Sequence, residues 1–207
     1  MAEKATLHFD GKDFDFPVLT GSESEKAFDI SELRKKTGLV TLDYGYLNTG
    51  STKSNITFVD GEQGILRYRG YAIEDLAEKA TFPETAWLLI YGELPTEEQL
   101  THFRKMLTEN ALIHENLLHF FREMPPSAHP MGILSSIVNA VGLFTPRFYD
   151  DEDKEDVFNL TTAGLISKIR TIAAFTYKAS IGEPFVYPEA ERSYCSNFLN
   201  MMFSSKT

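Results

Sequence analysis

Residues 56–71 read ITFVDGEQGILRYRGY, and within this stretch the chain changes from a strand pattern to a helix pattern. Apolar side chains alternate on both sides of residues 60–64, whose two glycines can supply the positive φ angles that a short connection needs. Two short antiparallel strands are therefore predicted. Beyond Gly70 the apolar residues recur at helical intervals. The sequence predicts a mainly α fold with a small amino-terminal β region.

A second alternating pattern lies upstream, from Ala5 to Val18, and is interrupted by the turn pair Asp10-Gly11. This pattern is typical of a β-hairpin. We therefore divide the chain into an amino-terminal β-rich region, residues 1–70, and the first part of a large α-helical domain, residues 71–207.

The helices downstream are predicted from their start and stop signals. Prolines open two of them, at Pro83 and Pro130, and a Thr-x-x-Gln capping box opens another at Thr96. His129 stands directly before Pro130, where its side chain can cap the helix. The predicted helical segments are residues 83–91, 96–111, 113–121, 130–141, about 165–176 (ending near Gly182) and 194–203.

Composition and charge exclude several classes of protein. The 207 residues are 43% hydrophobic and 24% charged, which is ordinary for a globular protein. A formal net charge of -10 repels phosphate backbones and anionic lipids, so we predict no nucleic acid and no membrane partner. The chain has neither a long apolar stretch nor a secretory signal pattern, which predicts a cytoplasmic protein.

Three motifs resemble metal or nucleotide sites but fail on spacing. Residues 45–52 nearly form a phosphate-binding loop, yet Ser51 stands where the lysine is needed. His114 and His119 are five residues apart, so on one helix they diverge by about 140° and cannot share a metal. The acidic run at residues 150–156 lacks EF-hand spacing and is read as a solvated face. We predict a simple loop, no metal site, and surface positions for His102 and His119.

The single cysteine, Cys195, excludes an internal disulfide and a cysteine-based metal cage. No histidine neighbours it in the sequence to activate a nucleophile. Lone cysteines are usually small buried hydrophobic residues, and Cys195 is expected to be one.

Residues 56–71 also carry a resemblance, because together with three later segments they resemble citrate synthases. The later segments are SAHPM at residues 127–131, IGEPFVYP at 181–188 and NFLNMMF at 197–203. The resemblance covers essentially the whole chain in order. Its strand-rich first 60 or so residues resemble the hexamer-forming (type II) enzymes of bacteria, and the chain then corresponds to their amino-terminal half.

The resemblance implies an enzyme that condenses acetyl-CoA with oxaloacetate to form citrate. The residues that perform this chemistry lie in the second half of the family's proteins, so no catalytic residue is expected before Thr207 and no cofactor is implied. The 207-residue chain alone is expected to be inactive. Two alternatives stay open: a 2-methylcitrate synthase that uses propionyl-CoA, and a non-catalytic helical assembly module.

Subunit contacts are expected in the full-length protein, as a homodimer or hexamer. The apolar stripe from Ile133 to Val141 and the apolar end near Phe203 would otherwise leave large patches in water.

Bacterial members of this family are often inhibited by NADH, and two positions here match those of NADH-sensing relatives: Lys168 and Tyr187. Other positions differ from the relatives' larger or polar contacts, namely Thr145, Gly164 and Ala190. Glu109 stands where a basic residue is found, and its carboxylate repels phosphates. We predict weak or absent control by NADH.

Overall fold

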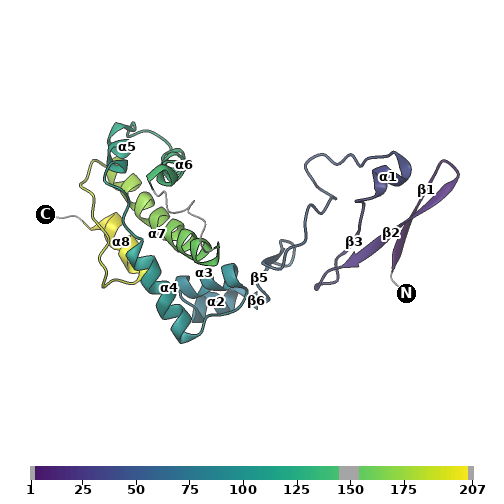
Figure 1. The fold of residues 1–207 in the computed structure, drawn as a ribbon, viewed down its shortest axis with the longest axis horizontal. Helices are drawn as coiled ribbons and strands as arrows, with labels where there is room; N and C mark the ends of the chain where they lie inside the picture. Colours follow the sequence, from purple (N-terminus) through teal and green to yellow (C-terminus); the bar gives the residue numbers. More distant parts are fainter. Residues whose placement is uncertain (1–2, 145–153, 205–207) are drawn as a thin grey trace. The chain divides into compact units, whose positions relative to one another are not determined.

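The computed structural model describes residues 3–144 and 154–204, with side chains from Val157 onward in the second range. Thr145 and the acidic run up to residue 156 therefore lie outside the described side chains. The chain forms two compact units, Met1–Asn55 and Ile56–Thr207 (Figure 1). The division that we placed between residues 70 and 71 remains a prediction about domains.

The first unit is a three-stranded antiparallel sheet with one short helix. The strands β1 (Lys4–Phe9), β2 (Lys12–Thr20) and β3 (Lys26–Phe28) lie in that order, and α1 (Leu33–Thr37) follows. The predicted hairpin is confirmed: Phe9 pairs with Lys12, and both turn residues have positive φ. The small core centres on Phe16, which is 2% exposed.

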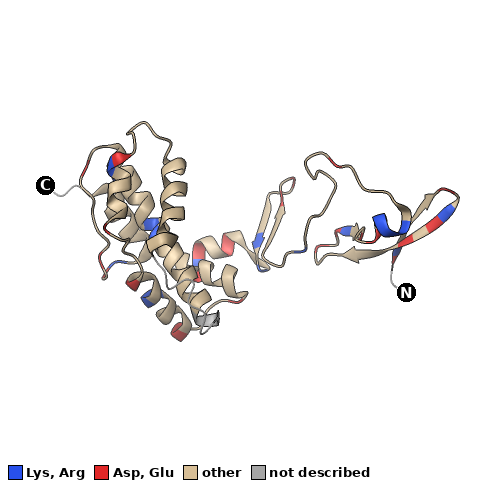
Figure 2. Ribbon diagram, turned by 45° about the horizontal axis from the view of Figure 1, so that its top comes forward, with Lys and Arg blue, Asp and Glu red and all other residues tan. Residues whose placement is uncertain are grey.

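Acidic and basic residues recur along this hairpin, as the red and blue bands of the ribbon show in Figure 2. The Lys4 ammonium lies 3.2 Å from the Asp15 carboxylate, and the Thr6 hydroxyl donates to the same carboxylate at 2.9 Å. These hydrogen bonds and the Lys4 charge lower the pKa of Asp15. Both side chains of the pair are exposed, and exposed ion pairs add little to the free energy of unfolding.

The second predicted strand pair is confirmed as β4 (Thr57–Asp60) and β5 (Ile65–Tyr68), with β6 (Tyr71–Ala72) added after a tight turn. The Asp60 carboxylate closes the connecting loop by accepting from the backbone N–H groups of Glu62 and Gln63. Arg69, in the left-handed region at φ 51°, donates from its guanidinium to the carbonyl of Leu89 at 2.8 Å. This bond ties the sheet to the first long helix.

Seven α-helices follow β6 in the described parts of the chain, which makes the fold mainly α. They are α2 (Ile73–Lys79), α3 (Phe82–Tyr91), α4 (Glu97–Glu109), α5 (Leu117–Glu123), α6 (Pro130–Val141), α7 (Lys154–Ser180) and α8 (Tyr194–Phe203), with a 3-10 turn η1 (Gly142–Phe144) after α6. None of the described helices is long and apolar enough to cross a membrane.

The local signals at the helix ends are confirmed. The Thr96 hydroxyl accepts from the Gln99 backbone N–H, and the Gln99 side-chain Oε1 accepts from the Thr96 backbone N–H. His129 caps α6 through its Nδ1, which accepts from the Met131 N–H at 3.2 Å. Gly92 ends α3 with φ 96°. These caps satisfy donors and acceptors that a helix end otherwise leaves without partners.

One helix start was predicted too early. Residues 113–116 are not helical, and α5 begins only at Leu117. Side chains of α7 hold the preceding backbone in another conformation, because the Thr171 hydroxyl donates to the carbonyl of Ala111 at 2.7 Å. The Asn116 N–H also donates to Nδ1 of His114 at 3.1 Å, which replaces a helical bond.

Helix α7 is the centre of the second unit and packs against α4, α5, α6 and α8 (Figure 1). Its Ile172 and Phe175 are fully buried in a cluster with α5 and α6, where the Phe175 ring stacks on that of Phe185 at 4.6 Å. A second cluster joins α3 and α4 to α7, with the Trp87 ring edge-on to Phe103 at 5.5 Å.

The carboxyl ends of α7 and α8 are joined by a buried ammonium. Lys178, 1% exposed, forms an ion pair with Glu183 and donates to the carbonyl of Ser204 at 2.9 Å. Two strong acceptors thus compensate its burial.

Candidate functional site

The two positions proposed for NADH contact, Lys168 and Tyr187, hold the two ends of one short segment, residues 110–115. The Lys168 ammonium donates to the carbonyl of Asn110 at 3.0 Å, at the carboxyl end of α4. Burial lowers the pKa of Lys168. A cation at the carboxyl end of a helix is favourable, so Lys168 has a structural role in stabilising the end of α4.

Tyr187 reaches the other end of the same segment. Its hydroxyl donates to the Glu115 carboxylate at 3.2 Å, and its ring lies edge-on to Phe175 at 5.6 Å. Burial raises the pKa of Tyr187, and the Glu115 charge adds to that rise. Lys168 and Tyr187 thus contact the two ends of one segment, at Asn110 and Glu115, rather than one another in the described structure.

The other positions that differ from NADH-sensing relatives, as far as the structure describes them, are Gly164, Glu109 and Ala190. Gly164 is buried within α7. Glu109 lies 3.8 Å from Lys105 one turn earlier on α4, and both line a pocket together with Ala190. Glu109 therefore places a carboxylate at this surface, as the sequence predicted.

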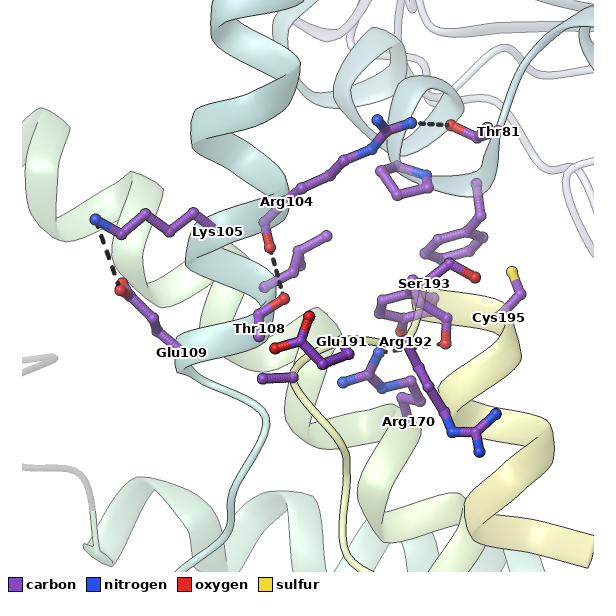
Figure 3. Close-up of a pocket in the computed structure, with 15 residues that line it drawn as sticks. Thr81, Arg104, Lys105, Thr108, Glu109, Arg170, Glu191, Arg192, Ser193 and Cys195 are labelled. Carbon is purple, nitrogen blue, oxygen red and sulfur yellow. Dashed lines mark hydrogen bonds and ion pairs between the residues drawn. The ribbon is translucent and has the colours of Figure 1, made fainter.

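This pocket has a volume of about 860 Å³ and lies where α3 and α8 begin beside the second half of α4 (Figure 3). Phe82 and Tyr194 stack on each other at 4.5 Å and form an apolar wall. Polar groups surround them: the Thr81, Thr108 and Ser193 side chains together with four basic and two acidic residues. The basic residues are Arg104, Lys105, Arg170 and Arg192; the acidic residues are Glu109 and Glu191.

Arg170 lies at the base of this pocket and was not singled out by the sequence. It is 6% exposed, its Nη1 donates to the Tyr194 carbonyl at 3.2 Å, and its guanidinium lies 4.3 Å from the centre of the Tyr194 ring. Its Nε has no hydrogen-bond partner among the described residues. The available signal was an arginine between Ile169 and Thr171 on a helix whose other residues are largely apolar. Arginine is seldom buried unless it has a partner, so its presence on a buried helix is informative.

Tyr194 is fixed by the same contacts. Its hydroxyl donates to the Ile166 carbonyl at 2.8 Å, and burial raises its pKa to about 12 against the opposing charge of Arg170. The Ile166 carbonyl and the Arg170 guanidinium thus contact Tyr194 at its hydroxyl and its ring face.

Cys195 corrects the sequence prediction, because its side chain is exposed and lines the pocket rather than the core. It stands one position after Tyr194, in the first turn of α8. At the start of α8 the inward-facing positions are those of Tyr194 and Asn197, and Asn197 is 3% exposed.

The loop at residues 45–52 directs its donors to its own chain. The Asp43 carboxylate accepts from the N–H groups of Leu47 and Asn48 and from the Thr49 hydroxyl. These bonds lower the pKa of Asp43. The next element is the strand β4 rather than a helix, so the arrangement that holds a phosphate in nucleotide-binding loops is not formed here.

The three histidines considered as metal ligands or surface residues differ in their surroundings. His102 and His119 are exposed, as predicted, while His114 packs its ring against Phe144 at 4.7 Å. Among the side chains described, those of residues 3–144 and 157–204, no three of His, Cys, Asp or Glu are grouped so that they could hold a metal ion.

The chain is similar to citrate synthases along nearly its whole length. A family model described as "Citrate synthase, C-terminal domain" matches residues 45–207. The chain is 43% identical over 201 residues to the protein named Citrate synthase 1 of Mycobacterium tuberculosis, in strains CDC 1551 / Oshkosh and ATCC 25618 / H37Rv. That match covers 97% of this chain and 46% of the mycobacterial protein, so the chain spans about half the length of these curated relatives.

Solved structures show the same fold. Citrate synthase from Thermotoga maritima MSB8 superposes with a TM-score of 0.67 at 29% identity, covering 81% of this chain and 43% of that one. Citrate synthase from Thermoplasma acidophilum, in its ternary complex with carboxymethyl coenzyme A and oxaloacetate, gives 0.72 at 26% identity and covers 80% and 43%. Since the family model alone matches well over half of the residues, this chain belongs to the citrate synthase family.

Proposed function

We propose that these residues are the amino-terminal portion of a citrate synthase whose full-length form condenses acetyl-CoA with oxaloacetate. The observation that carries the proposal is the 43% identity to Citrate synthase 1, which extends over 97% of this chain. The Thermoplasma relative, solved with a coenzyme A derivative and oxaloacetate, supports the choice of substrates. A cytoplasmic location is part of this proposal.

The 207-residue chain by itself is proposed to be inactive. The partial match supports this, since it covers 46% of the mycobacterial protein and leaves more than half of that protein's length without a counterpart in these residues. Release of coenzyme A thiol in the presence of oxaloacetate tests the proposal. We expect turnover from the full-length natural protein and none from the 207-residue chain; turnover by the short chain at a comparable rate contradicts it.

The acyl substrate separates citrate synthase from 2-methylcitrate synthase. Comparing kcat/KM for acetyl-CoA and propionyl-CoA on the full-length protein decides between them, and we expect acetyl-CoA to be preferred. A non-catalytic assembly module, the remaining alternative, is supported only if the full-length protein turns over neither substrate.

Assembly as a dimer or, as in type II enzymes, a hexamer is part of the proposal. The stripe from Ile133 to Val141 is not the exposed patch that we expected, because Ile133, Ile137 and Val141 are buried against α7. Other apolar side chains remain exposed near the ends of α6 and α8: Met131, Leu143, Leu199 and Phe203. A purely monomeric native mass of the full-length protein would contradict the proposed assembly.

Control by NADH is proposed to be weak. Glu109 is a carboxylate at a position where NADH-sensing relatives are expected to carry a basic residue, and the Lys168 ammonium is engaged by the Asn110 carbonyl. Inhibition of the full-length enzyme should be slight at low ionic strength. Half-inhibition by micromolar NADH would overturn this part of the proposal.

A further inference from the structure

Arg170 carries a buried positive charge that the described residues do not neutralise. The side chain is 6% exposed, and among the described residues no carboxylate forms an ion pair with it. Its hydrogen bonds are to one carbonyl, of Tyr194, and at 3.5 Å to the Ser167 hydroxyl. A guanidinium has five N–H donors in a planar fork, so its capacity is only partly used. Buried charges in proteins are ordinarily paired, because an unpaired one is costly.

The contrast with the other buried cation is informative. Lys178, at 1% exposure, has both a carboxylate and a carbonyl as partners. Of these two buried cations on α7, Lys178 is thus paired with residues beyond the helix, whereas Arg170 has no counter-ion among the described residues. That difference points to an anion that is supplied from outside these residues.

The surroundings of Arg170 favour such an anion. It lies at the base of the 860 Å³ pocket, whose volume is within the range of small-molecule sites (Figure 3). Two helices of ten residues each, α3 and α8, begin at this pocket; the Glu84 carboxylate already caps α3, and α8 directs the positive end of its dipole to the pocket. The carbonyls of the facing end of α4 are already engaged: that of Leu107 accepts from the Ser167 hydroxyl, and that of Thr108 from the Ala111 N–H.

Charge at the rim agrees with this polarity. Lys105 is paired with Glu109 at 3.8 Å and Arg192 with Glu189 at 2.7 Å. Outside these two ion pairs, the lining residues carry two basic side chains, Arg104 and Arg170, against one acidic side chain, Glu191. The Thr81 and Thr108 hydroxyls already donate, to the Glu84 carboxylate and to the Arg104 carbonyl, whereas the Ser193 hydroxyl accepts from the Ser196 N–H and can direct its proton to an anion.

We propose that this pocket binds the oxyanion of a small molecule, a phosphate or carboxylate group held by the Arg170 guanidinium, with Arg104 and Arg192 at the rim. The proposal does not depend on the reaction proposed above. It assigns to Arg170 the counter-ion that the described residues do not provide.

Cys195 gives a direct measurement of occupancy, because it lines the pocket and its thiol is exposed. The neutral reagent N-ethylmaleimide is applied to the full-length natural protein and to the 207-residue chain, and alkylation of the Cys195 peptide is followed by mass spectrometry. Pyrophosphate and malonate are the two probes, one for phosphoryl and one for carboxylate ligands. We expect saturable slowing of alkylation, at least fivefold, by one of them and none by chloride at equal ionic strength.

Arg170→Gln removes the charge that the proposal depends on and should raise the half-protecting concentration at least tenfold. Arg192→Gln, at the rim, should raise it a few-fold. Arg34→Gln removes the same charge from the exposed surface of α1 and is the matched control, expected to behave as the wild type.

Three results would overturn the proposal. The first is no saturable protection by either anion in the full-length protein. The second is equal half-protecting concentrations for wild type and Arg170→Gln; if that variant loses its helical far-UV spectrum, equal values in Arg104→Gln and Arg192→Gln count instead. The third is protection confined to the 207-residue chain, with Cys195 already blocked in the full-length protein, which would mean that polypeptide rather than a small anion fills the pocket.

Discussion

At the scale of single residues, the second unit depends on aromatic side chains that fill the space between α5, α7 and the extended segment after α7. Phe175 is fully buried and contacts three rings, those of Phe121, Phe185 and Tyr187. Truncating it removes those contacts and leaves a cavity that the neighbouring helices can only partly close.

Phe175→Ala should therefore lower the free energy of unfolding by about 3–5 kcal/mol. Urea titration followed by circular dichroism measures the change. Phe158→Ala is the control from the same helix, since Phe158 is 54% exposed, and it should leave the midpoint nearly unchanged. Similar losses from both substitutions would contradict the assigned core.

Tyr194 predicts a specific dependence of stability on alkaline pH. Its folded-state pKa of about 12 lies above the ordinary value of 10.0, so folding favours the protonated hydroxyl. This contribution is complete below pH 10 and is lost as pH rises from 10 through 12, because only the unfolded chain ionises freely there.

Urea unfolding of the wild type at pH 8, 10 and 11 should show stability falling over the upper interval. In Tyr194→Phe, which cannot ionise, that fall should be smaller, although the variant starts lower because the bond to the Ile166 carbonyl is absent. Equal slopes for the two proteins would exclude the assigned shift.

At the scale of elements, helix ends follow local sequence and can be tested locally. Thr96 caps α4 and exchanges backbone–side-chain bonds with Gln99. Thr96→Ala should lower the free energy of unfolding by about 1 kcal/mol. Thr101→Ala, in the exposed middle of the same helix, should leave stability unchanged or slightly raised, because alanine is the better helix former. A larger loss from Thr101→Ala than from Thr96→Ala would refute the cap.

The same scale shows what sequence reasoning could and could not reach. Capping boxes, first-turn prolines and turn glycines act within a few residues, so the starts of α4 and α6 and both hairpins were predicted correctly. The start of α5 was not, because Thr171 determines it from 60 positions away. Arg170 was missed for a related reason: only packing of α3, α4 and α8 around it makes a single arginine the base of a pocket.

At the scale of the whole molecule, the chain consists of two compact units with separate cores. The unit Met1–Asn55 has Phe16 and Leu33 as its buried apolar residues, whereas the other unit contains both helical clusters. Stability should therefore be concentrated in Ile56–Thr207.

Deleting residues 1–55 should leave the helical circular dichroism and the urea midpoint of residues 56–207 nearly unchanged. Amide exchange on the intact chain provides the companion measurement: α7 should exchange far more slowly than β1 and β2. A deletion product that is unfolded under native conditions would show instead that the second unit requires the first.

The ring contacts of Trp87 have an optical consequence. It is the chain's sole tryptophan, and it lies between α3 and α4, against Tyr91 and Phe103. Fluorescence excited at long wavelength therefore reports on the helical unit and leaves the amino-terminal sheet silent. A denaturation curve recorded by emission and one recorded on the hairpin amides would describe two different parts of the same polypeptide.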